Sequence, residues 1–288
     1  MRVGVMAMVT DEGIRPADLG RAVEERGFDS LFVPEHSHIP VGAEVPLREF
    51  ARLLDPLVTL TAAASATSRL LLGTAVLVVS QRDPIQTAKE AATLDLISDG
   101  RFVFGFGVGW LREEIAGHGT DPRVRGRVTD ERMHAIRGLW LDETAEFHGE
   151  HVDFGPVHAW PKPVQHPHPP IYVGGDSPAT HRRIAAYGDG WLANPLPGPA
   201  MADRIAALTD HIGRAVPVTV TAVPPDPGLL AAYAALGVER VALRVPTAPR
   251  DETLRALDNL ADLVASSGLD HAPGDLGVEG AHARAHRL

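Results

Sequence analysis

Short β-rich runs alternate with helical segments along nearly the whole chain, and this alternation limits the possible folds more than any other feature. Eight runs are expected to be strands: Val3–Met8, Ser30–Pro34, Leu70–Val78, Phe102–Val108, Ile171–Gly174, Gly190–Ala193, Val218–Ala222 and Arg240–Val245. Eight segments are expected to be helices, several with proline in the first turn: Pro16–Arg26, Pro56–Ala66, Pro84–Leu96, Thr129–Leu141, Pro178–Ala186, Ala200–Gly213, Pro227–Leu236 and Asp251–Ser266. Such alternation is typical of parallel strands. It predicts an α/β protein built as a single (β/α)8 TIM barrel, because two flavodoxin-like domains would need a linker that the chain lacks.

Three long irregular segments interrupt this pattern. They are insertions after the second strand (Glu35–Asp55) and after the fourth (Gly109–Val128), and a spacer before the fifth (Asp142–Pro170) with a hairpin expected to turn at Gly149. Barrel active sites lie at the C-terminal ends of the strands. The first two insertions therefore mark the face on which we expect the site.

The length of 288 residues is ordinary for one such barrel. We expect a single barrel domain over residues 1–270 and a loosely held tail over residues 271–288. Short helix-to-strand connections contain Gly27, Gly100 and Gly188, which are expected to end helices in the left-handed conformation.

Composition excludes several classes of partner and chemistry. The formal net charge is −10 without a basic cluster, so we expect no binding to nucleic acid or to an anionic membrane. The absence of cysteine excludes disulfides, thiolate metal sites and cysteine nucleophiles. No charged leader precedes the first strand and no apolar run is long enough to span a bilayer, so we expect a cytoplasmic protein.

The fourth strand has one face without side chains. Its odd positions are Gly105, Gly107 and Gly109, and its even positions are Phe102, Phe104, Phe106 and Trp110. Because successive side chains of a strand point to opposite faces, another backbone or a flat ligand is expected to approach the glycine face. The G-x-G-x-G spacing does not match the G-x-G-x-x-G dinucleotide fingerprint, so a Rossmann fold is not indicated.

Two further segments lack bulk where strands end. Gly174 and Gly175 follow the fifth strand and precede Asp176, the predicted N-cap Ser177 and a proline, which predicts either an anion site at a helix start or an ordinary capped turn. The third strand is broken by small residues at 73–75, which indicates a bulge near a site. The glycine-rich end of the fourth strand lies next to the Gly174-Gly175 turn in a barrel's strand order, and these two adjacent openings together favour a flat cofactor that carries phosphate.

Titratable side chains follow the second strand. Glu35, His36 and His38 place imidazoles beside a carboxylate at the expected barrel mouth, where proton chemistry is useful. Metal binding by these three is the less favoured reading, because no H-E-x-x-H spacing accompanies them, and we expect no metal.

Two other kinds of site find little support. Five histidines occur in the spacer without recognised ligand spacing and are interpreted as solvated: His148, His151, His158, His166 and His168. There is also no G-x-S-x-G elbow for a serine nucleophile.

Residues 1–194 resemble the luciferase-like monooxygenase superfamily. The segments that carry the resemblance are VPEHSHIP, DPLVTLTAAASATSRLLLGTAVLV, AKEAATLDLISDGRFVFGFGVGWLREE, RGRVTDERMHAIRGLW and PKPVQHPHPPIYVGGDSPATHRRIAAYGDGWL. More narrowly, they resemble its branch of oxidoreductases that use the deazaflavin coenzyme F-420. The resemblance implies a TIM barrel that holds a flavin or deazaflavin at its mouth.

The resemblance also implies roles for particular residues. A non-proline cis peptide that supports the ring would fall at Ala75-Val76, and the Asp-His pair of deazaflavin members corresponds to Glu35 and His36, the implied catalytic residues. The implied cofactor-binding residues are Thr74, Ala75, Val76, Gly107, Gly109, Gly174, Gly175, Asp176 and Ser177. Trp110 and His38 would line the substrate pocket. Arg125 would either approach the cofactor tail or form a surface ion pair.

One departure narrows the expected substrate. The glucose-6-phosphate dehydrogenases of the superfamily carry Glu directly after the fourth-strand glycines, where this chain has Trp110, and Lys89 and Lys162 are the only lysines. A small apolar substrate therefore fits better than a sugar phosphate.

The resemblance leaves three functions open. The first is hydride transfer with coenzyme F-420. The second is an FMN-dependent monooxygenase supplied with reduced flavin by a partner reductase, and the third is a non-catalytic flavin-binding protein, against which His36 argues. A homodimer through outer barrel helices is also implied.

Overall fold

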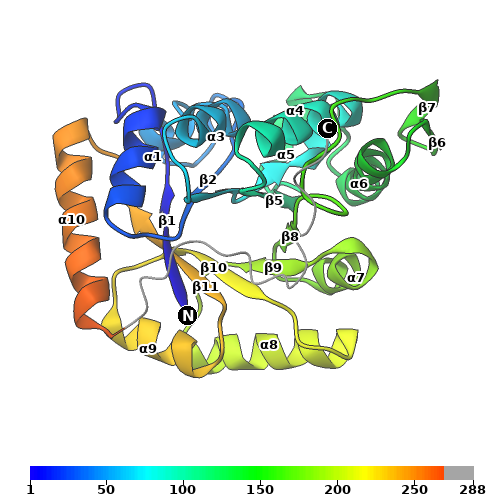
Figure 1. Cartoon of the computed structure of the whole chain (residues 1–288). Coiled ribbons are helices and arrows are strands. Elements are labelled where there is room, and N and C mark those ends of the chain that lie inside the picture. Colours follow the sequence, from blue (N-terminus) through cyan, green and yellow to red (C-terminus); the bar gives the residue numbers. More distant parts are fainter. Residues whose placement is uncertain (269–288) are drawn as a thin grey trace, which may run out of the picture.

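The computed structural model describes residues 1–268, which form a closed barrel of eight parallel strands (Figure 1). The strands are β1 (Arg2–Ala7), β2 (Ser30–Val33), β3 (Leu71–Thr74) with its continuation β4 (Leu77–Val78), β5 (Phe102–Gly107), β8 (Ile171–Gly174), β9 (Gly190–Ala193), β10 (Val218–Val223) and β11 (Arg240–Val245). Pairing of β1 with both β2 and β11, and of β3 with β5, closes the sheet. The predicted (β/α)8 barrel is confirmed.

Among residues 1–268, eight helices follow the barrel strands and surround them (Figure 1). They are α1 (Pro16–Glu25), α3 (Pro56–Ala64), α4 (Pro84–Ile97), α6 (Arg125–Leu141), α7 (Pro178–Tyr187), α8 (Gly198–Ile212), α9 (Pro227–Ala235) and α10 (Arg250–Ser266). Proline in the first turn combines with a side-chain cap at Asp55, Asp83, Ser177 and Asp226, which fixes four of the starts. Among residues 1–268, no helix is long and apolar enough to cross a membrane.

Additional short elements lie in the three irregular segments and directly after β4. The first insertion contains α2 (Leu47–Phe50), η1 (Val79–Gln81) follows β4, and α5 (Arg112–Gly117) lies in the second insertion. In the spacer, β6 (Ala145–His148) and β7 (Asp153–Val157) pair antiparallel around Gly149, which confirms the predicted hairpin. The hairpin projects at one edge of the barrel (Figure 1).

The two faces of β5 pack against different layers. Its phenylalanines pack toward the helices, with the Phe104 ring 5.3 Å from Trp140 and the Phe106 ring 6.1 Å from Tyr187. On the other face, a Cβ at Gly105 would collide with the carbonyl oxygen of Thr74. At this position the glycine makes room for the backbone of β3 rather than for a ligand.

Two of the three expected left-handed glycines are confirmed. Gly27 and Gly100 have φ of 78° and 73°, but Gly188 is extended, with φ of −92°. A Cβ at Gly188 would lie 2.8 Å from the Ile184 Cα atom and from a Val173 methyl group, so close packing explains this glycine. The expected tail, residues 271–288, lies outside the described residues.

Candidate active site

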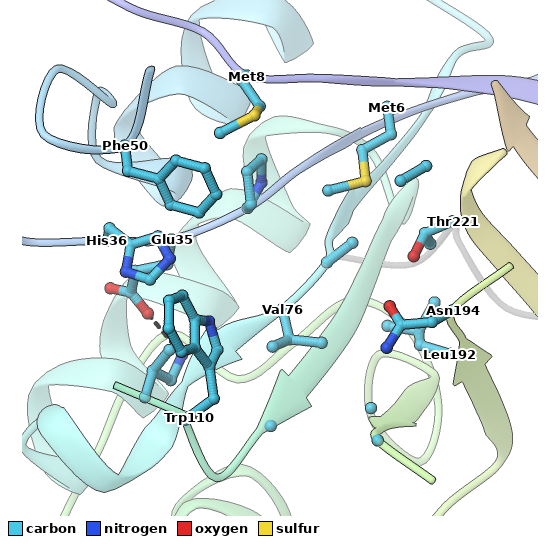
Figure 2. A pocket seen from close by; sticks show the side chains of 18 of the residues that line it. Met6, Met8, Glu35, His36, Phe50, Val76, Trp110, Leu192, Asn194 and Thr221 are labelled. Carbon is cyan, nitrogen blue, oxygen red and sulfur yellow. Dashed lines mark hydrogen bonds between the residues drawn. The ribbon is translucent and has the colours of Figure 1, made fainter. Parts of the chain in front are cut away.

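A pocket of about 510 Å³ opens at the C-terminal ends of the barrel strands (Figure 2). Its lining comes from strand ends and from the first two insertions: Met6, Met8, Pro34, Glu35, His36, Phe50, Ala75, Val76, Val78, Gly107, Val108, Gly109, Trp110, Glu114, Gly174, Gly175, Leu192, Asn194, Thr221, Ala222 and Arg244. Most of these side chains are apolar. Both the size and the lining are typical of a small-molecule site.

Val76 stands at the centre of this pocket (Figure 2). The peptide bond between Ala75 and Val76 is cis, as the resemblance implied. A Cβ at Gly107 or Gly174 would lie 2.8 or 2.6 Å from a methyl group of Val76. The glycines on these neighbouring strand ends therefore leave space for the Val76 side chain and keep the adjoining walls free of other side chains.

His36 and Glu114 form a buried pair at one end of the pocket. The His36 Nδ1 atom lies 2.7 Å from Glu114 Oε2, and the side chains are 8% and 1% exposed. An ionised carboxylate only accepts hydrogen bonds, so Nδ1 carries the proton and donates it. Within the described residues, Nε2 makes no hydrogen bond to the protein and is left to act in the pocket.

Glu114 is held in its ionised form. Burial opposes the charge, but the bond from His36 and the bond from the backbone N–H of Ser37, at 2.8 Å, outweigh burial and lower the pKa of Glu114. The rings of Phe50 and Trp110 lie 5.0 and 5.6 Å from that of His36 (Figure 2). The imidazole thus has a fixed acidic partner on one side and aromatic neighbours on the others.

The expected pairing of His36 with Glu35 is wrong. Glu35 lines the pocket, but its oxygens accept hydrogen bonds from the Val78 N–H and from Arg82. Burial raises the pKa of Glu35, and both of these contacts oppose the shift. Adjacent residues in extended chain point in opposite directions, so the carboxylate next in sequence to His36 binds elsewhere.

Four residues expected at the site do not line the pocket. The Thr74 hydroxyl donates to the Gly105 carbonyl, at 2.6 Å, and is fully buried between β3 and β5. Ser177 accepts the Thr180 N–H and caps α7 as predicted. The other two are His38, which is exposed outside the pocket, and Asp176, which forms an ion pair with Arg204 of α8.

Arg125 does not form the expected surface ion pair among residues 1–268. Its guanidinium donates to the backbone carbonyls of Gly109, at 3.2 Å, and Pro122, at 2.6 Å. It thereby fastens the second insertion where the chain leaves β5.

Several lining residues were not anticipated. They are Met6, Met8, Phe50, Glu114, Asn194, Thr221, Ala222 and Arg244. Barrel active sites lie at the C-terminal ends of strands, and this rule, which located Glu35, could also have identified five of these residues. They lie at the ends of β1, β9, β10 and β11: Met6, Met8, Asn194, Thr221 and Arg244. Ala222 has φ of 56° where the register of β10 with β11 shifts, and no sequence signal marks that position.

No cluster of His, Asp or Glu suited to a metal ion occurs among residues 1–268. The pocket lining also includes Arg244, which forms an ion pair with Glu49, with 3.3 Å between Nη2 and Oε2. The site therefore offers a hydrogen-bonded imidazole, an apolar cavity and bare backbone.

Comparison with known proteins gives the family. The sequence matches the family described as luciferase-like monooxygenase over residues 4–225. The chain belongs to the luciferase-like monooxygenase family. One relative that matches over nearly its whole length is an uncharacterized protein of Mycobacterium tuberculosis. It is 39% identical over 279 residues, which cover 91% of this chain and 98% of the relative.

Other proteins similar to this chain in sequence or in fold have named activities. An FMNH2-dependent dimethylsulfone monooxygenase of Pseudomonas putida is 32% identical over 145 residues, 48% of this chain and 40% of that protein. A monooxygenase from Streptomyces bottropensis has a similar structure, with a TM-score of 0.76 at 22% identity over 92% of this chain and 99% of that one. An F-420-dependent secondary alcohol dehydrogenase has a TM-score of 0.72 at 17% identity over 92% and 98%. The proteins similar to this chain thus include one named for FMNH2 and one named for F-420.

Proposed function

We propose that the protein transfers a hydride between the deazaflavin coenzyme F-420 and a small apolar organic substrate. The observation that carries the proposal is His36, whose Nδ1 is fixed by Glu114 while Nε2 is free in an apolar pocket. A proton acceptor placed this way suits oxidation of an alcohol, in which a hydroxyl proton and a hydride both leave the substrate.

The pocket residues fit a flat ring. Gly107 and Gly174 present bare backbone beside the Val76 side chain at the ends of β5 and β8, and Gly175, with φ of 105°, brings more bare backbone to the same edge. Ala75, Val76, Gly107, Gly109, Gly174 and Gly175 would hold the cofactor, which supplies hydride acceptance and donation when bound. FMN has a ring of similar shape, so these contacts support a flavin as well.

His36 would move the proton. Its Nε2 atom accepts the proton of a substrate hydroxyl in the oxidation direction and returns it in reduction. The ionised Glu114 stabilises the positive charge that His36 gains, and it holds the ring in one orientation. Burial of the pair excludes water from that side of the imidazole.

The apolar lining supports the substrate class. Met8, Phe50 and Trp110 gather on the His36 side of the pocket, whereas Asn194 and Thr221 lie on the opposite side, and Met6 lies between Met8 and Thr221 (Figure 2). No lysine lines the pocket, and the arginine that does, Arg244, is paired with Glu49. An apolar alcohol or ketone suits this lining better than a phosphorylated sugar.

A specific similarity favours one alternative. The match to the dimethylsulfone monooxygenase supports an FMN-dependent two-component monooxygenase that receives reduced flavin from a reductase. The same pocket would then serve oxygen chemistry.

Separate titrations with F-420 and FMN, followed by ligand fluorescence, decide between the two cofactors. We expect tighter binding of F-420 and bleaching of its visible absorbance on addition of members of a panel of small secondary alcohols. Preferential binding of FMN, with oxygen uptake on addition of reduced FMN, would replace the proposal by the monooxygenase.

A further inference from the structure

The hydroxyl of Ser37 connects the buried pair to the protein surface. Its Oγ atom lies 2.6 Å from His118 Nε2, 2.9 Å from His38 Nδ1 and 3.3 Å from Glu114 Oε1. The other oxygen of Glu114 holds His36. Both His38 and His118 are exposed, so an unbroken series of contacts leads from the pocket to solvent.

These contacts compete for a single proton. A hydroxyl has one proton to donate and two lone pairs with which to accept, whereas an ionised carboxylate only accepts. When Nε2 of His118 carries no proton, Ser37 can donate outward to it, and Oε1 of Glu114 keeps the Ser37 backbone N–H. When Nε2 is protonated it must donate to Ser37, which frees the hydroxyl proton for Glu114 or His38.

We propose that Ser37 is a positioning residue that couples the protonation of surface His118 to the His36–Glu114 pair. When the Ser37 hydroxyl donates to Glu114, the carboxylate accepts an additional hydrogen bond. The hydrogen bond that it accepts from Nδ1 of His36 then becomes weaker. Protonation of His118 therefore lowers the proton affinity of His36. The importance of this coupling for turnover rests on the proposed function, in which His36 accepts the substrate proton.

The surroundings of His118 set the pH at which the switch operates. Partial desolvation of the ring is the largest effect and lowers the pKa of His118; the charges of His38, Arg82 and Arg132 act in the same direction, and Glu114 opposes them. The folded protein therefore favours neutral His118 at neutral pH. The coupling should appear as the pH falls below the ordinary histidine value of 6.5.

NMR titration of the histidine imidazoles in the cofactor-free protein tests the coupling directly. In the wild type, we expect His36 to titrate with a second inflection that follows His118, and its apparent proton affinity to change about fivefold or more between the two states of His118. Ser37→Ala should remove the second inflection. Ser37→Thr, which keeps a hydroxyl, should retain it.

A second variant keeps the test decisive if Ser37→Ala does not fold. His118→Gln offers an uncharged N–H donor to Ser37, so His36 should titrate once, without the second inflection. A second inflection that persists in Ser37→Ala or His118→Gln, or that is absent from the wild type, would overturn the proposal. Because this readout needs no cofactor, its outcome is independent of whether F-420 binds.

Discussion

His36 is the side chain on which the proposed proton transfer depends. We predict that His36→Ala reduces turnover of the best alcohol in the panel by about 10²–10⁴-fold, the usual effect of a positioned acid or base. Affinity for F-420 and the melting temperature should change little. His148→Ala, at an exposed histidine of the β6–β7 hairpin, is the matched control. Full turnover by His36→Ala, or loss of activity through unfolding alone, would contradict the assigned role.

Glu114 makes stability depend on pH in a defined direction. Its pKa is lower in the folded protein than the ordinary value of 4.5, so its ionised form contributes stability above that pH. That contribution is lost as the pH falls through the folded value. Glu114→Gln should reduce the free energy of unfolding at pH 7 by about 1–3 kcal/mol.

Denaturant unfolding at several pH values checks this sign. The difference in stability between wild type and Glu114→Gln should be largest at neutral pH and should shrink in acid. A difference that grows as the pH falls would show that Glu114 is not held as a carboxylate.

The part of this site that depends on backbone was predictable from sequence. Gly107, Gly174 and Ala75 stood out in the sequence as positions without bulk, and all three line the pocket. The side-chain partners were harder, because Glu114 is far from His36 in sequence and meets it only when α5 folds over the mouth. Thr74 was misplaced for a related reason, since its small hydroxyl is used to join two strands.

Arg101 joins several elements at the start of β5. Its guanidinium donates to backbone carbonyls at the end of α3, in the loop before β3 and at the end of α4: Ala64, Thr67, Leu70 and Ser98. We predict that Arg101→Met lowers the free energy of unfolding by about 1–3 kcal/mol, because buried carbonyls lose their donors. Affinity for F-420 should not change, since Arg101 lies at the opposite end of β5 from the pocket.

Arg123→Met is the matched control for this prediction. Arg123 is exposed and, within the described part of the chain, its guanidinium pairs with Asp121 alone, so its loss should change stability by less than about 0.5 kcal/mol. Chemical denaturation of both variants compares them. Equal stability of Arg101→Met and Arg123→Met would refute the structural role of Arg101.

Barrel elements were predictable to within a few residues, whereas the short elements were not. Strands at 171–174, 190–193 and 240–245 have the expected bounds, because glycine, proline or charged residues limit them on both sides. The helices α2 and α5 span four and six residues, too few to show a helical period. Contacts with the rest of the fold, such as Glu114 with His36, determine their positions.

The homodimer that the resemblance implies would need apolar side chains on the outer surface of the barrel. Val58 of α3, Ile85 of α4 and Trp160 of the spacer are large apolar residues exposed to solvent. We predict that sedimentation gives the mass of a dimer and that Val58→Asp combined with Ile85→Asp shifts it toward the monomer, because buried carboxylates disfavour an apolar contact. Monomer mass for the wild type would contradict this prediction.

The central claim is that one pocket holds both the cofactor and His36. A Cβ at Gly174 lies 2.6 Å from Val76 and would push that side chain into the space for the ring, whereas a Cβ at the exposed Gly155 meets no atom within 4 Å. Fluorescence titration with F-420 is the most direct measurement. We predict that Gly174→Ala weakens binding about tenfold or more, equal to about 1.4 kcal/mol, while Gly155→Ala binds like the wild type. Wild-type affinity in a folded Gly174→Ala variant would place the cofactor elsewhere and contradict the account.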